Sequence, residues 1–213
     1  MIVRNPLLPV ISEPRLIDLA LVEIQARIST KLAWVNNAFG KAEKKGDSIK
    51  YPAVFVGGAK DEGYLKLFPD SNLGNYCFFD FEDGEEINNF GRRSAEMERK
   101  FGLVFCFDFT KVYPTFNKNR TVENVKNEVL QVLGKTGFKG STFRINEFHE
   151  EKQNVFKGYT ISEISKTANM RPYGFFRLSG EISYSQAGKC DLDSLQKALG
   201  INYMQIENDF EVS

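Results

Sequence analysis

Apolar residues recur at three- and four-residue steps near the start of the chain, which is typical of a helix with one buried face. The recurring positions are Ile17, Leu21, Ile24, Ile28, Leu32 and Val35. Ser12 is suited to cap such a helix, and Pro14 is suited to its first turn. We therefore predict a helix over about residues 14–37, with Gly40 just beyond it and a polar loop over residues 41–50.

Three short runs rich in aromatic and β-branched residues follow, and each predicts a strand. They cover residues 51–56, 64–68 and 76–81. Each run ends in residues that favour turns, such as the pair Gly57 and Gly58 after the first run. The close spacing of the three strands predicts an antiparallel meander.

A polar stretch over about residues 84–100 comes next, and we interpret it as a loop or a poorly ordered excursion. Residues 101–113 then predict one long, bent strand. Alternation along this strand places Leu103, Phe105, Phe107 and Phe109 on one face, and Val104, Cys106 and Asp108 on the other. Because both faces are largely apolar, we expect the strand to be central and covered on both sides.

A second helix is predicted between Thr121, which is suited to cap it, and Gly134, which is suited to end it. Its apolar stripe consists of Val122, Val125, Val129 and Val132. Residues 141–149 alternate as a strand does. Residues 151–170 fit no single pattern, residues 191–199 favour a short helix, and the remaining C-terminal residues favour a strand or a tail.

Residues 175–184 alternate clearly and predict a half-buried strand. The residues predicted to face the core are Phe176, Leu178, Ile182 and Tyr184, and those predicted to face water are Arg177, Ser179, Glu181 and Ser183. The order helix, strands, helix, strands predicts an α+β fold, in which two main helices pack on one mainly antiparallel sheet. No repeat or linker divides the chain, so we predict one domain over residues 1–213 with a polar excursion at about 84–100.

Charge and cysteine usage narrow the function classes. The 28 basic and 28 acidic residues cancel, so the chain has no general electrostatic attraction to nucleic acid or to an anionic membrane. No stretch approaches the ~20 apolar residues of a membrane span. Cys77 and Cys106 lie inside apolar runs and Cys190 is remote from both, which favours small buried side chains over a zinc site. We expect a reducing, cytosolic compartment.

Two aspartates are the strongest candidates for chemistry. Asp108 lies in a hydrophobic strand, where a buried carboxylate is costly unless it is paired. Asp80 lies in another predicted strand, so the two carboxylates could hold a divalent metal for phosphodiester hydrolysis. A lysine suited to assist that reaction is not evident in a nearby strand. We therefore predict no catalytic, cofactor-binding or metal site, and keep a metal-dependent nuclease or hydrolase using Asp80 and Asp108 as an alternative.

Other candidates have simpler interpretations. The acidic group Asp80, Glu82, Asp83, Glu85 and Glu86 lacks the ligand spacing of a calcium loop and is interpreted as a solvated turn. His149 has no serine or cysteine nucleophile in a known motif, so we interpret it as a solvated side chain. Gly57 and Gly58 lack a phosphate-binding pattern, and Arg92 with Arg93 is too short a basic patch to indicate a partner.

A group of aromatic residues could be interpreted as a ligand box, but core or interface packing is the simpler interpretation. The group consists of Trp34, Phe39, Tyr51 and Tyr64.

The order of elements resembles the tail-terminator proteins (tail-completion, minor tail protein U-like) of long-tailed phages and prophages. Those proteins typically begin with a helix and continue with a strand that opens on Tyr-Pro, here Tyr51 and Pro52. An aromatic central strand follows, here residues 103–109, and then a helix, here residues 122–133. A late strand opens near an arginine or an aromatic pair, here residues 171–176. The resemblance spans most of the chain.

The resemblance implies a non-enzymatic structural protein that terminates the tail tube or joins the tail to the head. It implies no catalytic residues, no cofactor, and self-association into rings, often hexamers, that contact tail-tube and head-connector proteins. It places the protein in the host cytoplasm and in the virion. We expect residues 84–100, with Ile87, Phe90 and Met97 as isolated apolar anchors, to be an arm for the ring contact. A monomeric module that binds a partner peptide at a sheet edge is a further alternative.

Overall fold

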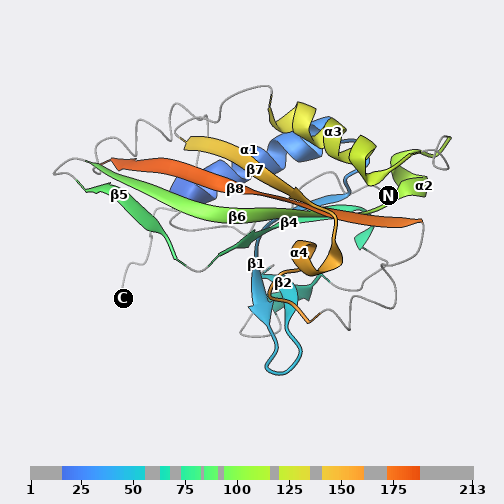
Figure 1. Ribbon diagram of the computed structural model, residues 1–213, viewed down its shortest axis with the longest axis horizontal. Helices are drawn as coiled ribbons and strands as arrows, with labels where there is room; N and C mark the ends of the chain where they lie inside the picture. Colours follow the sequence, from blue (N-terminus) through green and yellow to red (C-terminus); the bar gives the residue numbers. More distant parts are fainter. Residues whose placement is uncertain are drawn as a thin grey trace, which may run out of the picture.

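A mixed eight-stranded sheet with helices on its faces is formed by the residues that the computed structural model describes (Figure 1). Those residues are 16–55, 63–67, 73–82, 84–90, 94–115, 120–134, 141–160 and 172–187. The strands are β1 (Asn37–Lys45), β2 (Tyr51–Phe55), β3 (Tyr64–Lys66), β4 (Tyr76–Phe81), β5 (Glu86–Phe90), β6 (Ser94–Asp108), β7 (Ser141–His149) and β8 (Tyr173–Ala187). The helices are α1 (Leu16–Lys31), α2 (Phe109–Val112), α3 (Val122–Leu133) and α4 (Lys152–Val155).

The strand order is β3-β2-β1-β4-β6-β8-β7, and β5 pairs with β6 beyond the end of β4. Every described pair is antiparallel except β1 with β4. The predicted α+β class with a mainly antiparallel sheet is therefore confirmed. The predicted meander of β2, β3 and β4 is right for β2 with β3, which pair antiparallel, and wrong for β4, which lies beside β1 and not beside β3. Apolar alternation carries no information about strand direction, so the sequence pattern could not distinguish these pairings.

Helix α1 is shorter than predicted. It ends at Lys31, although Leu32 and Val35 continue the apolar period and are both buried. The chain turns away because the backbone N–H groups of Asn36 and Asn37 both donate to the carbonyl of Asn75, at 2.7 and 3.2 Å. The predicted end at residue 37 was wrong because Leu32 and Val35, which follow the helix, are buried and continue its three- and four-residue spacing.

Two segments predicted as polar loops are strands. Residues 41–45 belong to β1, in which Ala42 is buried between exposed Lys41 and Lys44. Residues 86–90 form β5, and residues 94–100 form the first half of the 15-residue strand β6. Both predictions failed because these strands are largely polar. A strand is largely polar when one of its faces is solvated or when it lies exposed near the sheet edge.

The second half of β6 has the two apolar faces that its alternation predicted. Phe105 and Phe107 belong to the main core cluster, and Val104 belongs to a second cluster on the opposite face. The strand stops at Asp108 and does not continue to residue 113 as predicted. The Asp108 carboxylate accepts hydrogen bonds from the backbone N–H and the hydroxyl of Thr110, at 2.9 and 2.7 Å, and so caps the short helix α2.

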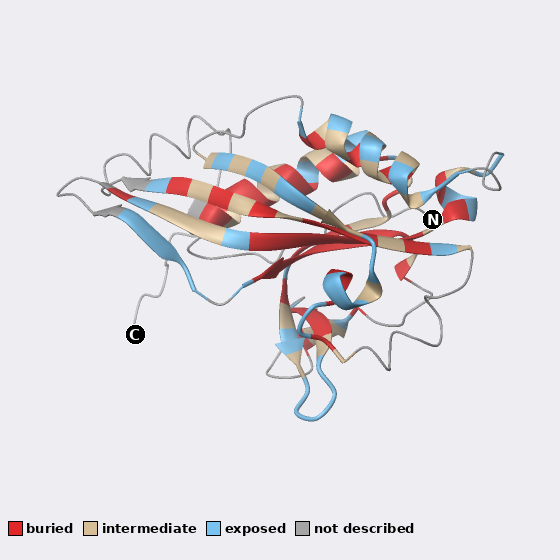
Figure 2. Cartoon of the chain, in the orientation of Figure 1, coloured by how far each residue is buried: buried red, intermediate tan, exposed pale blue. Residues whose placement is uncertain are grey.

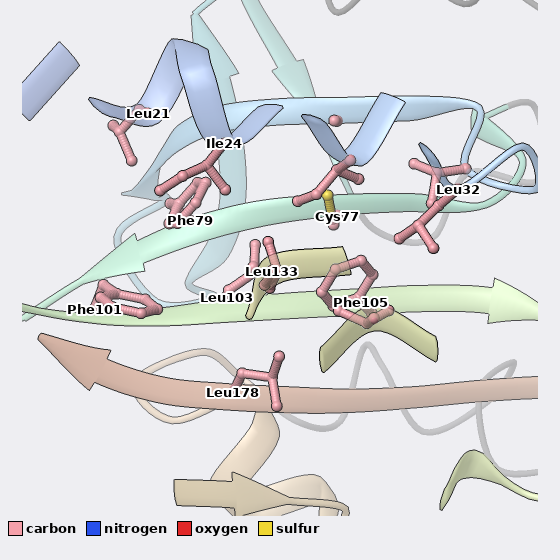
Figure 3. Close-up of a cluster of buried hydrophobic side chains, with 14 of the residues drawn as sticks. Leu21, Ile24, Leu32, Cys77, Phe79, Phe101, Leu103, Phe105, Leu133 and Leu178 are labelled. Atoms are coloured by element: carbon pink, nitrogen blue, oxygen red, sulfur yellow. The ribbon is translucent and has the colours of Figure 1, made fainter. Parts of the chain in front are cut away.

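Helices α1 and α3 pack on the sheet, as predicted, and both cover the same face (Figure 1). Figure 3 shows Leu21 and Ile24 from α1 directed at Phe79 of β4, with Leu133 of α3 near the middle of the sheet. In α3, Thr121 and Asn124 form a capping box, and Gly134 follows the helix. Its buried residues are Val125, Val129 and Leu133, whereas the predicted Val122 and Val132 are partly buried.

The opposite face carries a second, smaller buried cluster, to which α4 and residues of β1, β2 and β4 contribute. Phe39 of β1, Val54 of β2 and Phe156 after α4 pack there on Phe78 and Val104. Figure 2 shows buried residues in the middle of β6, whereas the residues at the β5 end are largely exposed. None of the described helices is both long enough and apolar enough to cross a membrane.

Several predictions fall outside the described residues. They concern the helix start at residues 12–15, Gly57 and Gly58, Arg92 and Arg93, residues 161–170, and everything from Cys190 to the C-terminus.

Candidate functional site

A polar hollow of about 510 Å³ lies on the face of the sheet away from α1 and α3, beside α4. Its lining includes Lys100 of β6, Asn146, Glu147 and His149 of β7, and Arg177 and Ser179 of β8. A volume of this size is within the range of small-molecule sites. The hollow is therefore the candidate site within the described part of the chain.

Strand register explains why polar residues meet there. Asp80 of β4 pairs with Gly102 of β6, Gly102 pairs with Ser179 of β8, and Ser179 pairs with Glu147 of β7. Residues paired across a sheet point to the same face. One row across four strands thus carries a carboxylate, a bare glycine, a hydroxyl and a second carboxylate.

Arg177 is buried at the floor of the hollow, contrary to the prediction that it faces water. Its side chain is 3% exposed. Nη1 donates to Oδ2 of Asp80 at 2.7 Å, and Nε donates to Oγ of Ser179 at 3.2 Å. The side chain crosses β6 to reach β4, because Gly102 has no side chain to block it. The alternation correctly identified the polar face of β8 but could not show that this part of the face is buried.

The Asp80 carboxylate has three side-chain partners, namely Arg177, Tyr159 and Lys44. The Tyr159 hydroxyl donates to its Oδ1 at 3.0 Å, and Lys44 Nζ lies 3.9 Å from the same oxygen. Burial, followed by the neighbouring Asp80 charge, raises the pKa of Tyr159 well above its usual range, so this hydroxyl stays a donor. Arg177 and the more exposed Lys44 both lie beside this one carboxylate, and of the two cations only Arg177 lines the hollow.

The rim of the hollow carries paired charges. Lys157, which follows α4, donates to Glu82 at 3.2 Å and lowers the pKa of that carboxyl. His149 lies 3.0 Å from Glu147 and is only partly exposed, so the predicted solvated histidine is in fact part of the lining. Lys100 pairs with Glu86 at 3.7 Å. The cations Lys157 and Lys100 of the rim are therefore each matched by a carboxylate.

The two aspartates considered for a metal site are not brought together. Asp80 pairs with Gly102, and Asp108 lies six residues further along the same strand, about 20 Å away at the usual rise of a strand. Asp80 is held by Arg177 and Tyr159, and Asp108 caps α2. In the described residues, no group of three or more His, Cys, Asp or Glu side chains is placed to hold a metal ion.

The acidic residues predicted as one solvated turn have separate environments. Asp80 is buried, Glu82 pairs with Lys157, and Glu86 pairs with Lys100. Glu85 accepts a hydrogen bond from the Tyr184 hydroxyl. The solvated interpretation is right for the exposed glutamates and wrong for Asp80.

The aromatic group does not form a ligand box. Trp34 packs on Phe105 and Phe107 at the main core, whereas Phe39 lies in the second cluster. Tyr64 stands over the sheet edge, where its hydroxyl donates to Glu43 at 2.9 Å. Of the cysteines, Cys77 is fully buried and Cys106 is partly exposed, and both are free thiols.

Sequence reasoning missed Arg177, Tyr159 and Lys44 as a group. One signal was available: Gly102 lies inside a hydrophobic strand, and a glycine there often marks the close approach of another group. The geometry suits binding of a ligand, because the buried Arg177 is held in place by Asp80 and offers hydrogen-bond donors at the floor. No known family model, curated protein or solved structure matches the chain.

Proposed function

We propose that this protein is a non-enzymatic assembly protein of a phage or prophage tail, which closes the tail tube or joins the tail to the head as a ring of identical subunits. The proposal rests on the order of elements set out above and on one feature of the sheet. That feature is a ribbon made of β5 and the adjoining ends of β6 and β8. In the view of Figure 1 the ribbon reaches beyond the helices.

The exposed side of β5 is the observation that carries the proposal. Ile87 on β5 is 58% exposed. Among the described strands, β5 pairs only with β6, which leaves its other edge without a strand partner. An edge with open backbone groups and an exposed apolar side chain can receive a strand from another chain.

The ribbon modifies the idea of an arm over residues 84–100. Met97 packs against the subunit's own core, so it is not an anchor for a neighbour. Ile87 remains available for one. A closed ring repeats one contact between two different surfaces around an axis, and the β5 edge supplies one of those surfaces. Assembly of this kind would take place in the host cytoplasm, and the product would remain in the virion.

Solution mass tests the ring. Native mass spectrometry over a range of concentrations should detect assemblies, and Ile87→Lys should shift them to monomers. Ile49→Lys is the matched control, because Ile49 is also an exposed isoleucine, 46% exposed, near the turn between β1 and β2. Equal assembly of the Ile87 and Ile49 variants would exclude β5 as the contact.

Removal of the gene tests the biological role. Without this protein we expect heads and tails to accumulate unjoined, or tails of uncontrolled length, in electron micrographs of lysates. Normal particles from the deletion strain would contradict the proposal, whatever the solution mass is.

A further inference from the structure

The floor of the hollow holds hydrogen-bond donors that the protein itself does not use. Arg177 has five N–H donors in a planar group. Nη1 and Nε bond to Asp80 and Ser179, and Nη2 has no acceptor among the described residues. The Ser179 oxygen accepts from Arg177, so its own proton is free to be donated. Arg177 and Ser179 both line the hollow.

The surroundings of Arg177, the buried cation that lines the floor, favour an anion with a single charge. Arg177 and Lys44 share one carboxylate, Asp80. Around them, Glu82 pairs with Lys157 and Glu147 with His149. The last carboxylate of the lining, Glu181, pairs in register with Lys100 on one side and Arg144 on the other. A phosphate monoester, with a charge of about −1.5 to −2, would meet three rim carboxylates.

We infer that the hollow binds a carboxylate group, held by Arg177 and Ser179 at its floor. A guanidinium edge matches the two oxygens of a carboxylate. Ser179 adds a neutral donor beside it, and the bare backbone of Gly102 leaves room for the guanidinium to lie across β6. The ligand is either a small carboxylic acid or a carboxylate at the end of a peptide.

Nuclear magnetic resonance titration of the full chain tests this. The probes are acetate, inorganic phosphate, and acetylated triglycine with either a free or an amidated C-terminus, all at equal ionic strength. We expect saturable shifts of the Ser179 and Gly180 amide signals with the two carboxylates. Dissociation constants on the order of 1 mM are reasonable for such small probes.

Matched variants assign the site. Ser179→Ala should weaken acetate binding about 5-fold, the equivalent of one lost hydrogen bond. Arg177→Lys should weaken it more, because lysine lacks the two-pronged geometry. Ser183→Ala is the control: Ser183 lies on the same face of β8 and bonds to Glu98. If Arg177→Lys does not fold, as judged by circular dichroism, the comparison of Ser179→Ala with Ser183→Ala still tests the inference.

Each outcome bears on the inference. Tighter binding of the free triglycine peptide than of acetate would identify a protein terminus as the ligand, and comparable binding would identify a small acid. Saturation by the amidated peptide, preference for phosphate, no saturation at all, or equal effects of the two serine variants would overturn the inference.

Discussion

The guanidinium of Arg177 occupies the space in which a side chain at residue 102 would begin. A Cβ on Gly102 would lie 2.0 Å from Arg177 Cζ. Gly102→Ala must therefore displace Arg177 from Asp80 or distort β6. Breaking a buried ion pair costs about 3–5 kcal/mol, so we expect the free energy of unfolding in urea to fall by about 3 kcal/mol or more.

Gly40→Ala provides the control for that substitution. Gly40 is also a buried strand glycine, but its Cβ would lie 3.6 Å from Gln25, an ordinary contact distance. We expect a change within about 1 kcal/mol, because alanine also reduces the entropy of the unfolded chain. Similar losses for the two variants would mean that the position of Arg177 is not what Gly102 protects.

Tyr159→Phe should destabilise the fold by removing one donor from a buried carboxylate. The Asp80 oxygen that accepts from Tyr159 keeps only Lys44, at 3.9 Å. A lost hydrogen bond to a charged group corresponds to about 1.5–3 kcal/mol. Tyr113→Phe should cost less, because its 3.3 Å bond to Glu128 is only partly buried. Thermal unfolding of both variants measures the difference, and a larger loss for Tyr113→Phe would contradict this account of Asp80.

Asn75→Asp should be strongly destabilising at neutral pH. Asn75 Oδ1 accepts from the backbone N–H of Asp108, and Nδ2 donates to the carbonyl of Trp34 at 3.0 Å. Aspartate keeps the acceptor but sets a second oxygen against that carbonyl, in a residue with no solvent exposure. We expect a loss of about 3 kcal/mol.

Protonated aspartate can donate to Trp34, so acid should narrow the gap between Asn75→Asp and the wild type. Urea unfolding of both at about pH 7 and about pH 4 tests this. A gap that is the same at both pH values would show that the Trp34 hydrogen bond is not the cause.

Because the thiol of Cys77 is buried, we expect the protein to lose stability at alkaline pH. Burial raises the pKa of its thiol far above the ordinary value of about 9. The unfolded chain therefore releases this proton first, so the stabilisation is complete below about pH 9 and declines above it. Relative to Cys77→Ala, the wild type should lose about 1.4 kcal/mol between about pH 8 and about pH 10. A constant difference between the two proteins would contradict the buried thiol.

The buried parts of the fold were predictable from sequence, because burial leaves a regular pattern. The faces of β6, the cap at Thr121 and the inward residues of β8 follow from alternation and capping rules. The positions of β1 and β5 were not predictable from sequence, because Lys41, Lys44 and Glu86 give these strands the composition of loops. A hydrophobic pattern in the sequence indicates which positions are buried. A strand with one face in water has few buried positions, so its hydrophobic pattern is weak.

The hollow was hidden for a different reason. Arg177 and Asp80 are 97 residues apart, and each has a plain local explanation, a solvated arginine and a carboxylate in an acidic turn. Only the pairing of β4 with β6 and of β6 with β8 places them on one row. Strand order and direction are set by the whole sheet, so a local pattern contains no trace of such a pair.

The place of β8 in the sheet has a consequence for synthesis. β8 is the last described strand, yet it lies between β6 and β7 and pairs with β6 along fifteen consecutive residues. Until the ribosome has released residue 187, β6 lacks one neighbour and β7 has none among the described strands. Between the synthesis of residue 149, the end of β7, and that of residue 187, the nascent chain therefore carries open, partly apolar edges on both strands, the condition in which strands pair wrongly between chains. A ribosome stalled before residue 173 should hold a chain that binds chaperones and is readily cleaved by protease.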